Sequence, residues 1–264
     1  MNLKITTLAE RPELTGPLWN MAEDWPEFIL HDPVGWSLIG RIVKELPEYV
    51  LVATDEDAPG GDATDEDTPG KDTPGKVLAR AFSVPFALRD RGAGELPDGG
   101  WDQVLLWAFS DLRHGKRADT VSAIEITVDE TARGKGLSGM MLDAMRDNAR
   151  AHGFAEVVAP VRPNAKHLEP AARIDEYAYR TREDGLPHDP WLRVHVRAGG
   201  TIEKVAHASM TVSGSTAQWR EWTGLPFDTQ GPVEVPGALV PVHCELERGY
   251  GVYVEPNVWV RHTL

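Results

Sequence analysis

The stretch EITVDETARGKGLSG, residues 125–139, connects a strand-like segment to a helix-like segment through a loop with two closely spaced glycines. Residues 118–128 are rich in Val, Ile and Thr, which is typical of a β-strand. From Leu137 to Met145 the apolar residues recur with helical spacing, and Gly153 suits the end of that helix. A second strand is predicted over residues 154–161, so the order is strand, loop, helix, strand.

The loop has the properties of an anion-binding site. A loop that leads into a helix leaves backbone N–H groups unpaired, and the helix dipole adds positive partial charge at the same point. Glycines allow the backbone to approach a phosphate closely, and basic side chains add flexible positive charge. The sequence therefore predicts a pyrophosphate-binding loop made of Arg133, Gly134, Lys135, Gly136, Leu137 and Ser138.

Residues 133–139 differ from two other kinds of nucleotide-binding loop, the Walker loop and the dinucleotide-binding loop. The Gly-Lys-Ser/Thr ending of a Walker loop is absent at the required spacing. Residues 134–139 do spell the dinucleotide fingerprint G-x-G-x-x-G, and Glu156 lies near the distance of its ribose-binding acid. In that fingerprint the first glycine follows its strand directly, whereas residues 129–133 intervene here. Dinucleotide binding remains an alternative to be tested by the topology of the sheet.

The pattern Arg133-x-x-Gly136-x-Ser138, preceded by EITVDET and followed by a helix ending in AHGF, resembles motif A of the GNAT superfamily of acyltransferases. The resemblance covers roughly residues 75–205. It implies an α+β (mixed α/β) GNAT fold, a strongly twisted mixed β-sheet flanked by helices and splayed at the acyl-CoA site. It also implies acyl-CoA, with acetyl-CoA expected, as co-substrate without a metal. The pantetheine arm would then lie against Ile126 and Val128.

The resemblance also suggests catalytic candidates. In WLRVHVRAGG, residues 191–200, alignment on Gly199 places His195 where the family has a tyrosine that commonly protonates the departing thiolate. Histidine can act as an acid or a base near neutral pH, and a histidine packed in the core is the alternative interpretation. Glu125 is a candidate base on its strand. Asn164 is a candidate for orienting the acyl carbonyl, or else a turn residue after a proline.

Four further segments resemble a GNAT-like subgroup that includes stand-alone bacterial proteins and loading domains of polyketide synthases. They are residues 189–191, 219–224, 235–242 and 254–259. The subgroup implies an alternative function, malonyl-CoA decarboxylation or acyl transfer to or from an acyl carrier protein in natural-product biosynthesis. A threonine and an arginine expected there are replaced by Asn164 and Ala208, which argues against decarboxylation. Ordinary acyl transfer to an amine or hydroxyl of a small-molecule acceptor remains the leading hypothesis. A CoA-binding module without turnover is the third hypothesis.

Composition limits the remaining possibilities. The chain of 264 residues is 41% apolar, and we expect one domain over residues 1–264. A formal charge of -14 argues against nucleic acid as a partner, and the nine histidines show no zinc-ligand spacing. No long apolar run or signal peptide is present, so we expect a cytoplasmic protein without a membrane partner. Nothing in the sequence indicates an oligomeric state.

An acidic repeat interrupts the N-terminal half. ATDEDAPGG at residues 53–61 returns as ATDEDTPGK at residues 63–71, without an apolar residue that could anchor a strand or a helix. We therefore expect a disordered insert over residues 55–76 between strands at 49–54 and 77–85. The chain's single cysteine, Cys244, alternates like a buried strand residue.

Weaker patterns outline the ends of the chain. A first strand is predicted over residues 3–7, and two helical segments over residues 12–46 are separated near Pro33. Asp189 followed by proline begins another short helix. Strands are predicted at residues 238–246 and 251–261.

Overall fold

The structure is a computed structural model that describes residues 2–22, 25–59, 75–91 and 94–264. Its strands are β1 (Leu3–Thr7), β2 (Val50–Pro59), β3 (Gly75–Phe86), β4 (Thr120–Val128), β5 (Glu156–Val161), β6 (Thr201–Ser215), β7 (Gly231–Val233), β8 (Val242–Glu245) and β9 (Tyr250–Thr263). Its α-helices are α1 (Thr15–Trp19), α2 (Pro33–Glu45), α3 (Gly100–Arg113), α4 (Leu137–Ala151), α5 (Ile174–Tyr177), α6 (Pro190–Arg197) and α7 (Thr216–Thr223). Short 3₁₀ turns cover Pro12–Leu14, Glu27–His31, Pro47–Tyr49, Glu130–Ala132 and Lys166–Leu168.

All of these strands belong to one sheet in the order β1-β2-β3-β4-β5-β9-β8-β7, with β6 paired to β9. Among the described strands, β4 and β5 form the one parallel pair, and the other pairs are antiparallel. A dinucleotide-binding fold of the fingerprint type needs a mostly parallel, doubly wound sheet. The topology therefore excludes the dinucleotide alternative, and it confirms the mixed sheet flanked by helices.

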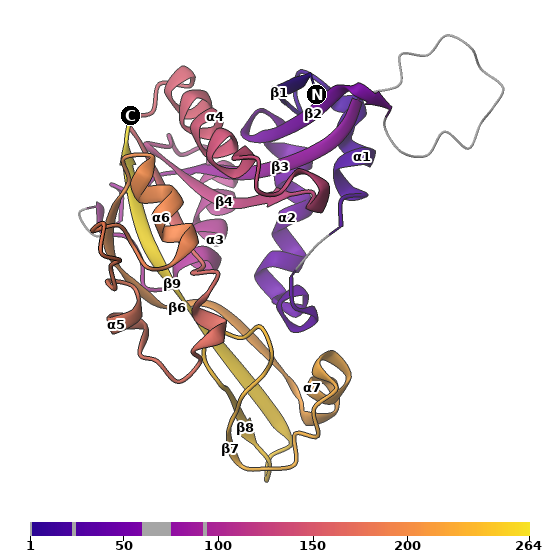
Figure 1. Cartoon of the computed structure of the whole chain (residues 1–264), viewed down its shortest axis with the longest axis vertical. Coiled ribbons are helices and arrows are strands. Elements are labelled where there is room, and N and C mark those ends of the chain that lie inside the picture. Colours follow the sequence, from indigo (N-terminus) through magenta and orange to yellow (C-terminus); the bar gives the residue numbers. More distant parts are fainter. Residues whose placement is uncertain (1, 23–24, 60–74, 92–93) are drawn as a thin grey trace, which may run out of the picture.

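Helices cover both faces of the main sheet. In Figure 1, α4 and α6 lie in front of the sheet, and α3 lies behind it. The helix α4 contacts β3, β4 and β5, and it also contacts α6. On the other side α3 contacts β3, β6 and β9, with α2 beside it. The larger hydrophobic core fills the space between these layers and the sheet.

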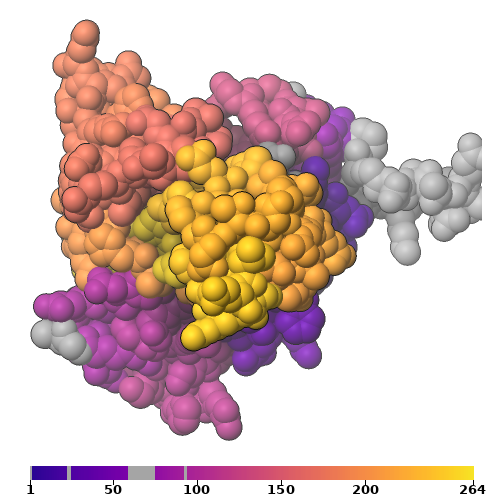
Figure 2. All heavy atoms as spheres, turned by 90° about the horizontal axis from the view of Figure 1, so that it is seen from below, coloured from indigo at the N-terminus to yellow at the C-terminus, as the bar shows by residue number. Residues whose placement is uncertain are grey.

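A smaller lobe is built on the far ends of β6 and β9. Figure 1 shows these strands running down out of the main sheet, with β7, β8 and α7 around their lower end. A second hydrophobic cluster lies there, formed around Phe28, Trp219, Tyr253, Val242 and Cys244. Figure 2 views the molecule from this end, and the lobe stands in front in orange and yellow. The placement of Cys244 in a buried strand is thereby confirmed.

Several sequence predictions agree with the observed elements. The order β4, loop, α4, β5 is present, and Gly153 ends α4 with a φ of +84°. The strand at residues 3–7, the helical segment after Pro33 and the helix after Asp189 are also confirmed. The helical segment predicted before Pro33 is divided into α1 and two 3₁₀ turns, Pro12–Leu14 and Glu27–His31. The strand predicted at residues 238–246 is shorter than expected, because it covers Val242–Glu245. The helices α3 and α7 were not predicted.

The acidic insert requires a correction. The strand β2 continues to Pro59 and β3 begins at Gly75, with Asp55 opposite Lys76. Backbone pairing holds this segment without apolar side chains, and Asp55 Oδ1 accepts a hydrogen bond of 2.8 Å from the N–H of Asn2. Residues 60–74, the rest of the predicted insert, lie outside the described residues. No helix of the described chain is both long and apolar enough to cross a membrane.

Candidate active site

The predicted pyrophosphate loop lies between the end of β4 and the start of α4. The Asp129 side chain accepts a hydrogen bond of 2.9 Å from the N–H of Thr131, which closes the 3₁₀ turn Glu130–Ala132. Gly134 and Gly136 then take φ values of +75° and +77°, which favour glycine. The turn fixes where the loop leaves the strand, and the two glycines turn it into the helix.

The loop presents backbone donors to solvent. The N–H groups of residues 134–138 find no acceptor in the described part of the chain, and Met140 is the first helical residue whose N–H reaches back, to Gly136 O. The side chains of Arg133 and Lys135 are exposed beside these donors. Leu137 is buried in the core and anchors the start of α4, while Ser138 is half-buried. Unpaired N–H groups, a helix N-terminus and two cations suit a pyrophosphate.

The strands β4 and β5 separate next to this loop. They pair at Val121 with Val157 and at Ser122 with Val158, and no pairing follows toward Val128. The edge of β4 that faces β5 is therefore open over its second half, which contains Ile126 and Val128. This is the splayed sheet expected from the sequence, and both residues lie along the opening.

A β-bulge marks the middle of β4. Phe82 on β3 pairs with Glu125 and Ser83 pairs with Ala123, so Ile124 has no partner in that register. The carbonyl of Ile124 accepts a hydrogen bond of 2.9 Å from the indole Nε1 of Trp101 on α3. A bulge bends its strand and redirects backbone groups. Trp101 therefore holds the bulge from the face opposite to α4.

Glu125 lies beside the bulge in a nearly closed environment. Its side chain is 9% exposed and forms an ion pair with Arg80, whose side chain is 1% exposed. The Nε atom of Arg80 is 2.9 Å from Glu125 Oε1, and the hydroxyl of Thr127 donates to the same oxygen at 2.7 Å. One oxygen is thus fully engaged, and any proton transfer by Glu125 has to use Oε2. Its role as a base stays a prediction.

Asn164 lies in the turn that follows β5, and its side chain is exposed. The next residue, Ala165, donates its N–H to Asp189 Oδ2 at 3.0 Å, and Asp189 also caps the start of α6. The structure therefore brings Asn164, the start of α6 and the open ends of β4 and β5 to one side of the sheet. This position suits contact with a substrate, and the assignment of Asn164 stays a prediction.

His195 is buried on α6, with 5% of its surface exposed. Its Nδ1 is 2.9 Å from Nε2 of His262 on β9, so one ring donates to the other. Burial, and then the neighbouring His262, lower the pKa of His195 to about 3, and burial lowers the pKa of His262 to about 4. Both rings are neutral at neutral pH. A neutral imidazole releases its proton poorly, and in this structure His195 is a hydrogen-bonding partner of His262. Its role as an acid or a base stays a prediction.

The register places this histidine pair at the closed end of the opening. His262 pairs with Val157, which pairs with Val121, where β4 and β5 are still joined. The bulge at Ile124 lies three residues farther along β4, roughly 10 Å at the usual rise of a strand. The structure thus brings Glu125, Ile126 and Val128 together with the loop, and it leaves His195 deeper in the sheet.

Sequence reasoning missed Trp101, Arg80 and a carboxylate pair formed by the buried Asp32 and the half-buried Asp102. The pair joins α2 to α3, and no local pattern announces it. The spacing of Val104, Leu105, Ala108 and Phe109 would have revealed α3 and with it the position of Trp101. Among the described residues, no group of three or more His, Cys, Asp or Glu side chains is arranged to hold a metal ion.

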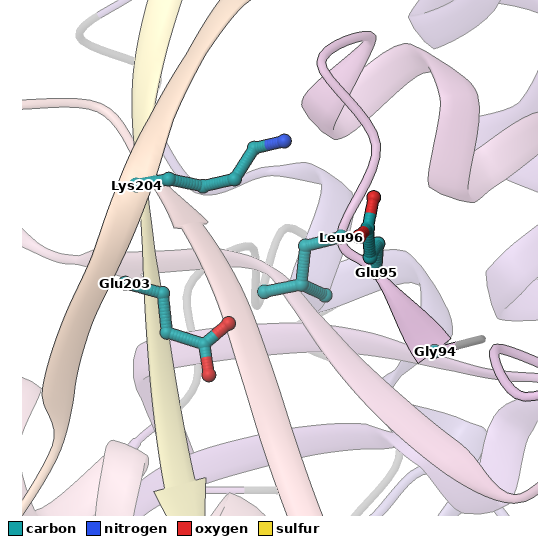
Figure 3. Close-up of a pocket in the computed structure, with 5 residues that line it drawn as sticks. All are labelled: Gly94, Glu95, Leu96, Glu203 and Lys204. Atoms are coloured by element: carbon teal, nitrogen blue, oxygen red, sulfur yellow. The ribbon is translucent and has the colours of Figure 1, made fainter. Parts of the chain in front are cut away.

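One surface pocket lies elsewhere. A hollow of about 550 Å³ lies between residues 94–96 and β6, where Glu203 and Lys204 line it. Figure 3 shows both side chains extending from the strand toward the opposite loop. No residue predicted for the active site lines this pocket. The opening between β4 and β5 therefore remains the candidate site.

Comparisons with known proteins agree with this geometry. No family model matches the chain. The chain is 30% identical over 287 residues to the arginine N-acetyltransferase avaD of Aspergillus versicolor, an alignment that covers 98% of this chain and 93% of that protein. Among solved structures, the loading GNATL domain of CurA from Lyngbya majuscula is 17% identical with a TM-score of 0.58, covering 99% of this chain and 96% of that domain. The GphF GNAT-like decarboxylase in complex with isobutyryl-CoA is 14% identical with a TM-score of 0.50, covering 100% and 99%.

Proposed function

This chain belongs to the GNAT superfamily of acyltransferases, and from that premise we propose that it transfers an acetyl group from acetyl-CoA to an amine of a small molecule. The observation that carries the proposal is the open edge of β4 beside a loop whose N–H groups have no partner in the described part of the chain. The near full-length similarity to an arginine N-acetyltransferase supports an amine as the acceptor.

The loop and the open strand bind different parts of acetyl-CoA. Residues 133–138 bind the pyrophosphate, and the edge of β4 around Ile126 and Val128 binds the pantetheine arm through backbone groups that β5 does not pair. The carbonyl of Val128 accepts a hydrogen bond of 3.3 Å from Arg133 Nε, so this bond gives way when the arm binds there. The thioester then lies near the bulge at Ile124. Fixing both reactants at one strand makes the reaction effectively unimolecular, which is a large part of the rate enhancement in such transfers.

The chemistry requires one nucleophile and two proton movements. The amine nitrogen attacks the thioester carbonyl, a C–N bond forms, and the C–S bond breaks with the electron pair going to sulfur. Backbone N–H groups at the bulge stabilise the oxyanion. We assign the proton from the amine to Glu125 Oε2, directly or through a water, because Glu125 adjoins the bulge. The departing thiolate takes its proton from solvent water. His195 positions the α6 side of the opening through its bond to His262.

An acyl carrier protein is the alternative acceptor or donor. The similarity to an arginine N-acetyltransferase supports a small molecule instead, and Asn164 and Ala208, which replace an expected threonine and arginine, argue against decarboxylation. The two possibilities differ in the product that they release, so one experiment separates them.

The test incubates the protein with acetyl-CoA, malonyl-CoA and a carrier-bound acetyl thioester, each with and without a panel of amines. Free thiol, carbon dioxide and product mass are followed together. We expect thiol release that depends on an amine, with an amide as the product. Carbon dioxide from malonyl-CoA, or acyl transfer to the carrier without an amine, would contradict the proposal. Binding of CoA without any turnover would favour the non-catalytic module.

A further inference from the structure

Two carboxylates meet in the interior between α2 and α3. Asp32 precedes α2 and is 2% exposed, and Asp102 lies in the first turn of α3. One oxygen of each is used by a backbone N–H: Asp32 Oδ2 accepts from Gly35 at 2.5 Å, and Asp102 Oδ2 accepts from Thr211 at 3.1 Å. Both Oδ1 atoms are buried and receive no hydrogen bond from any other group in the described part of the chain, and the two carboxyl groups are close enough to bond to each other through a shared proton.

No basic side chain of the described residues forms an ion pair with either carboxylate. The nearest charged neighbours compensate each other: the Nε atom of Arg162 is 2.9 Å from Glu255 Oε2, and the hydroxyl of Tyr253 donates to that same oxygen at 2.8 Å. Two buried carboxyl groups side by side are costly, because neither has a cationic partner and their negative charges repel each other. An occupant that is positive and carries several N–H donors would remove that cost.

Trp101 connects this pair to the place of acyl transfer. Trp101 immediately precedes Asp102 in the chain, and its Nε1 donates a hydrogen bond to the carbonyl of Ile124 at the bulge. At the other end of the ring, Cη2 lies 3.1 Å from where a Cβ on Gly35 would stand, and the Gly35 N–H binds Asp32. The length of one indole ring therefore separates the carboxylates from the bulge. An amine at the bulge can belong to a molecule whose other end reaches Asp32 and Asp102.

Hydrogen bonds to two strands hold the start of α3, which carries Trp101 and Asp102, in place. The N–H of Trp101 donates to Ser209 Oγ at 2.8 Å, and Ser209 Oγ donates to Asn257 Oδ1 at 2.5 Å. These bonds tie α3 to β6 and β9. Binding groups that are fixed in advance lose little entropy when a ligand arrives.

We propose that Asp32 and Asp102 form a subsite for the guanidinium group of the acceptor, whose nucleophilic amine lies at the bulge of β4. This inference rests on the N-acetyltransferase function proposed above and names its substrate class. A guanidinium presents several N–H donors in a planar fork, which suits two carboxylate oxygens from different directions. The chain supplies no such fork of its own at this point in the described residues.

The protonation of the pair adds a second readout. Burial raises the pKa of Asp32 to about 6, and burial together with the neighbouring Asp32 raises the pKa of Asp102 to about 8, with Glu255 acting in the same direction on both. At neutral pH the pair therefore holds about one proton. A guanidinium replaces this proton, so binding releases a proton and becomes tighter as the pH rises from 6 to 8.

The kinetic test compares arginine with citrulline, in which a neutral ureido group replaces the guanidinium. The wild-type protein is expected to prefer arginine by roughly 10- to 150-fold in kcat/KM, the equivalent of one charge-assisted hydrogen bond. Asp102→Asn should lower kcat/KM for arginine much more than kcat/KM for citrulline, so that the preference for arginine largely disappears. Asp32→Asn is the second variant, because asparagine keeps the cap of α2. Asp98→Asn, which removes an exposed partner of Lys204, is the control that leaves the preference intact.

A binding measurement separates the two proposals. Arginine is titrated into the protein by calorimetry in two buffers of different ionisation enthalpy, and proton release that disappears in Asp102→Asn supports the subsite without any turnover. If no amine is acetylated but this binding is present, the proposed function fails and the subsite stands. If amines are acetylated with an arginine-to-citrulline ratio that Asp102→Asn does not change, the subsite is wrong and the function stands.

Discussion

Gly136 and Gly153 offer a matched pair of substitutions at the two ends of α4. Both have a positive φ, +77° and +84°, and an added Cβ would meet no heavy atom within 4 Å at either position. Alanine in the left-handed region costs about 1–2 kcal/mol at each site. For a chain of this size we expect both variants to lose roughly 2–8 °C in Tm. Their effects on the fold should therefore be alike.

Their effects on CoA should differ. In the proposed complex, Gly136 directs the N–H groups of Leu137 and Ser138 at the pyrophosphate, whereas Gly153 lies at the other end of α4. If the alanine introduced by Gly136→Ala relaxes away from the left-handed region, at least one of these donors turns aside. A hydrogen bond to a charged group contributes about 1.5–3 kcal/mol, so Gly136→Ala should weaken CoA binding roughly 10- to 150-fold. Gly153→Ala should keep the wild-type affinity.

Calorimetric titration with CoA, combined with thermal unfolding by circular dichroism, measures both quantities on the same samples. Equal weakening in the two variants would mean that CoA binding follows stability and not the loop. Unchanged affinity in Gly136→Ala would place the pyrophosphate elsewhere.

Three further predictions concern other parts of the molecule. The pKa of His195 is lowered in the folded protein, so between about pH 3 and 6.5 the unfolded chain binds a proton that the folded chain does not bind. The free energy of unfolding therefore falls as the pH drops below about 6.5. Below pH 6.5 the difference in unfolding free energy between wild type and His195→Asn should shrink by about 1.4 kcal/mol per pH unit in urea titrations, and a constant difference would contradict the assignment. The raised pKa values of Asp32 and Asp102 act in the opposite direction but are common to both proteins. Trp101→Phe removes the bond to Ile124 and should lower kcat roughly five- to tenfold without changing CoA affinity, and a wild-type kcat would refute the positioning role. Replacing residues 60–74 by Asn-Gly should leave Tm and CoA affinity near the wild-type values, because Pro59 and Gly75 already pair, and an insoluble product would contradict this.

The sequence predicted the loop and its flanking elements because their signals are local. Strand composition, two glycines and a helical repeat all lie within residues 118–161. The helix α3 escaped notice because Gly99 and Gly100 stand at its start and resemble a loop, although its apolar residues have helical spacing. The strand at Asp55 to Pro59 escaped notice because its partners come from distant parts of the chain.

In the candidate site, too, local patterns predicted single residues but not the distant residues that contact them. The position of His195 on a helix follows from a local match, but its hydrogen-bond partner, His262, is 67 residues farther along the chain. Glu125 was predicted without Arg80, which neutralises it from the neighbouring strand. Asp32 and Asp102 meet only because α2 packs against α3. Long-range pairs of polar side chains leave no periodic pattern, so sequence reasoning cannot place them.

Cys244 makes the smaller lobe individually observable. It is the one cysteine of the 264 residues, it lies fully buried on β8, and burial raises the pKa of its thiol. A thiol-reactive dye therefore labels the native protein only through openings that expose the cluster around Trp219 and Tyr253. The larger core is chemically silent toward the same dye. If the labelling rate equals the rate of global unfolding, the two cores open together through β6 and β9. If labelling is faster, the smaller lobe opens locally while the larger core stays folded.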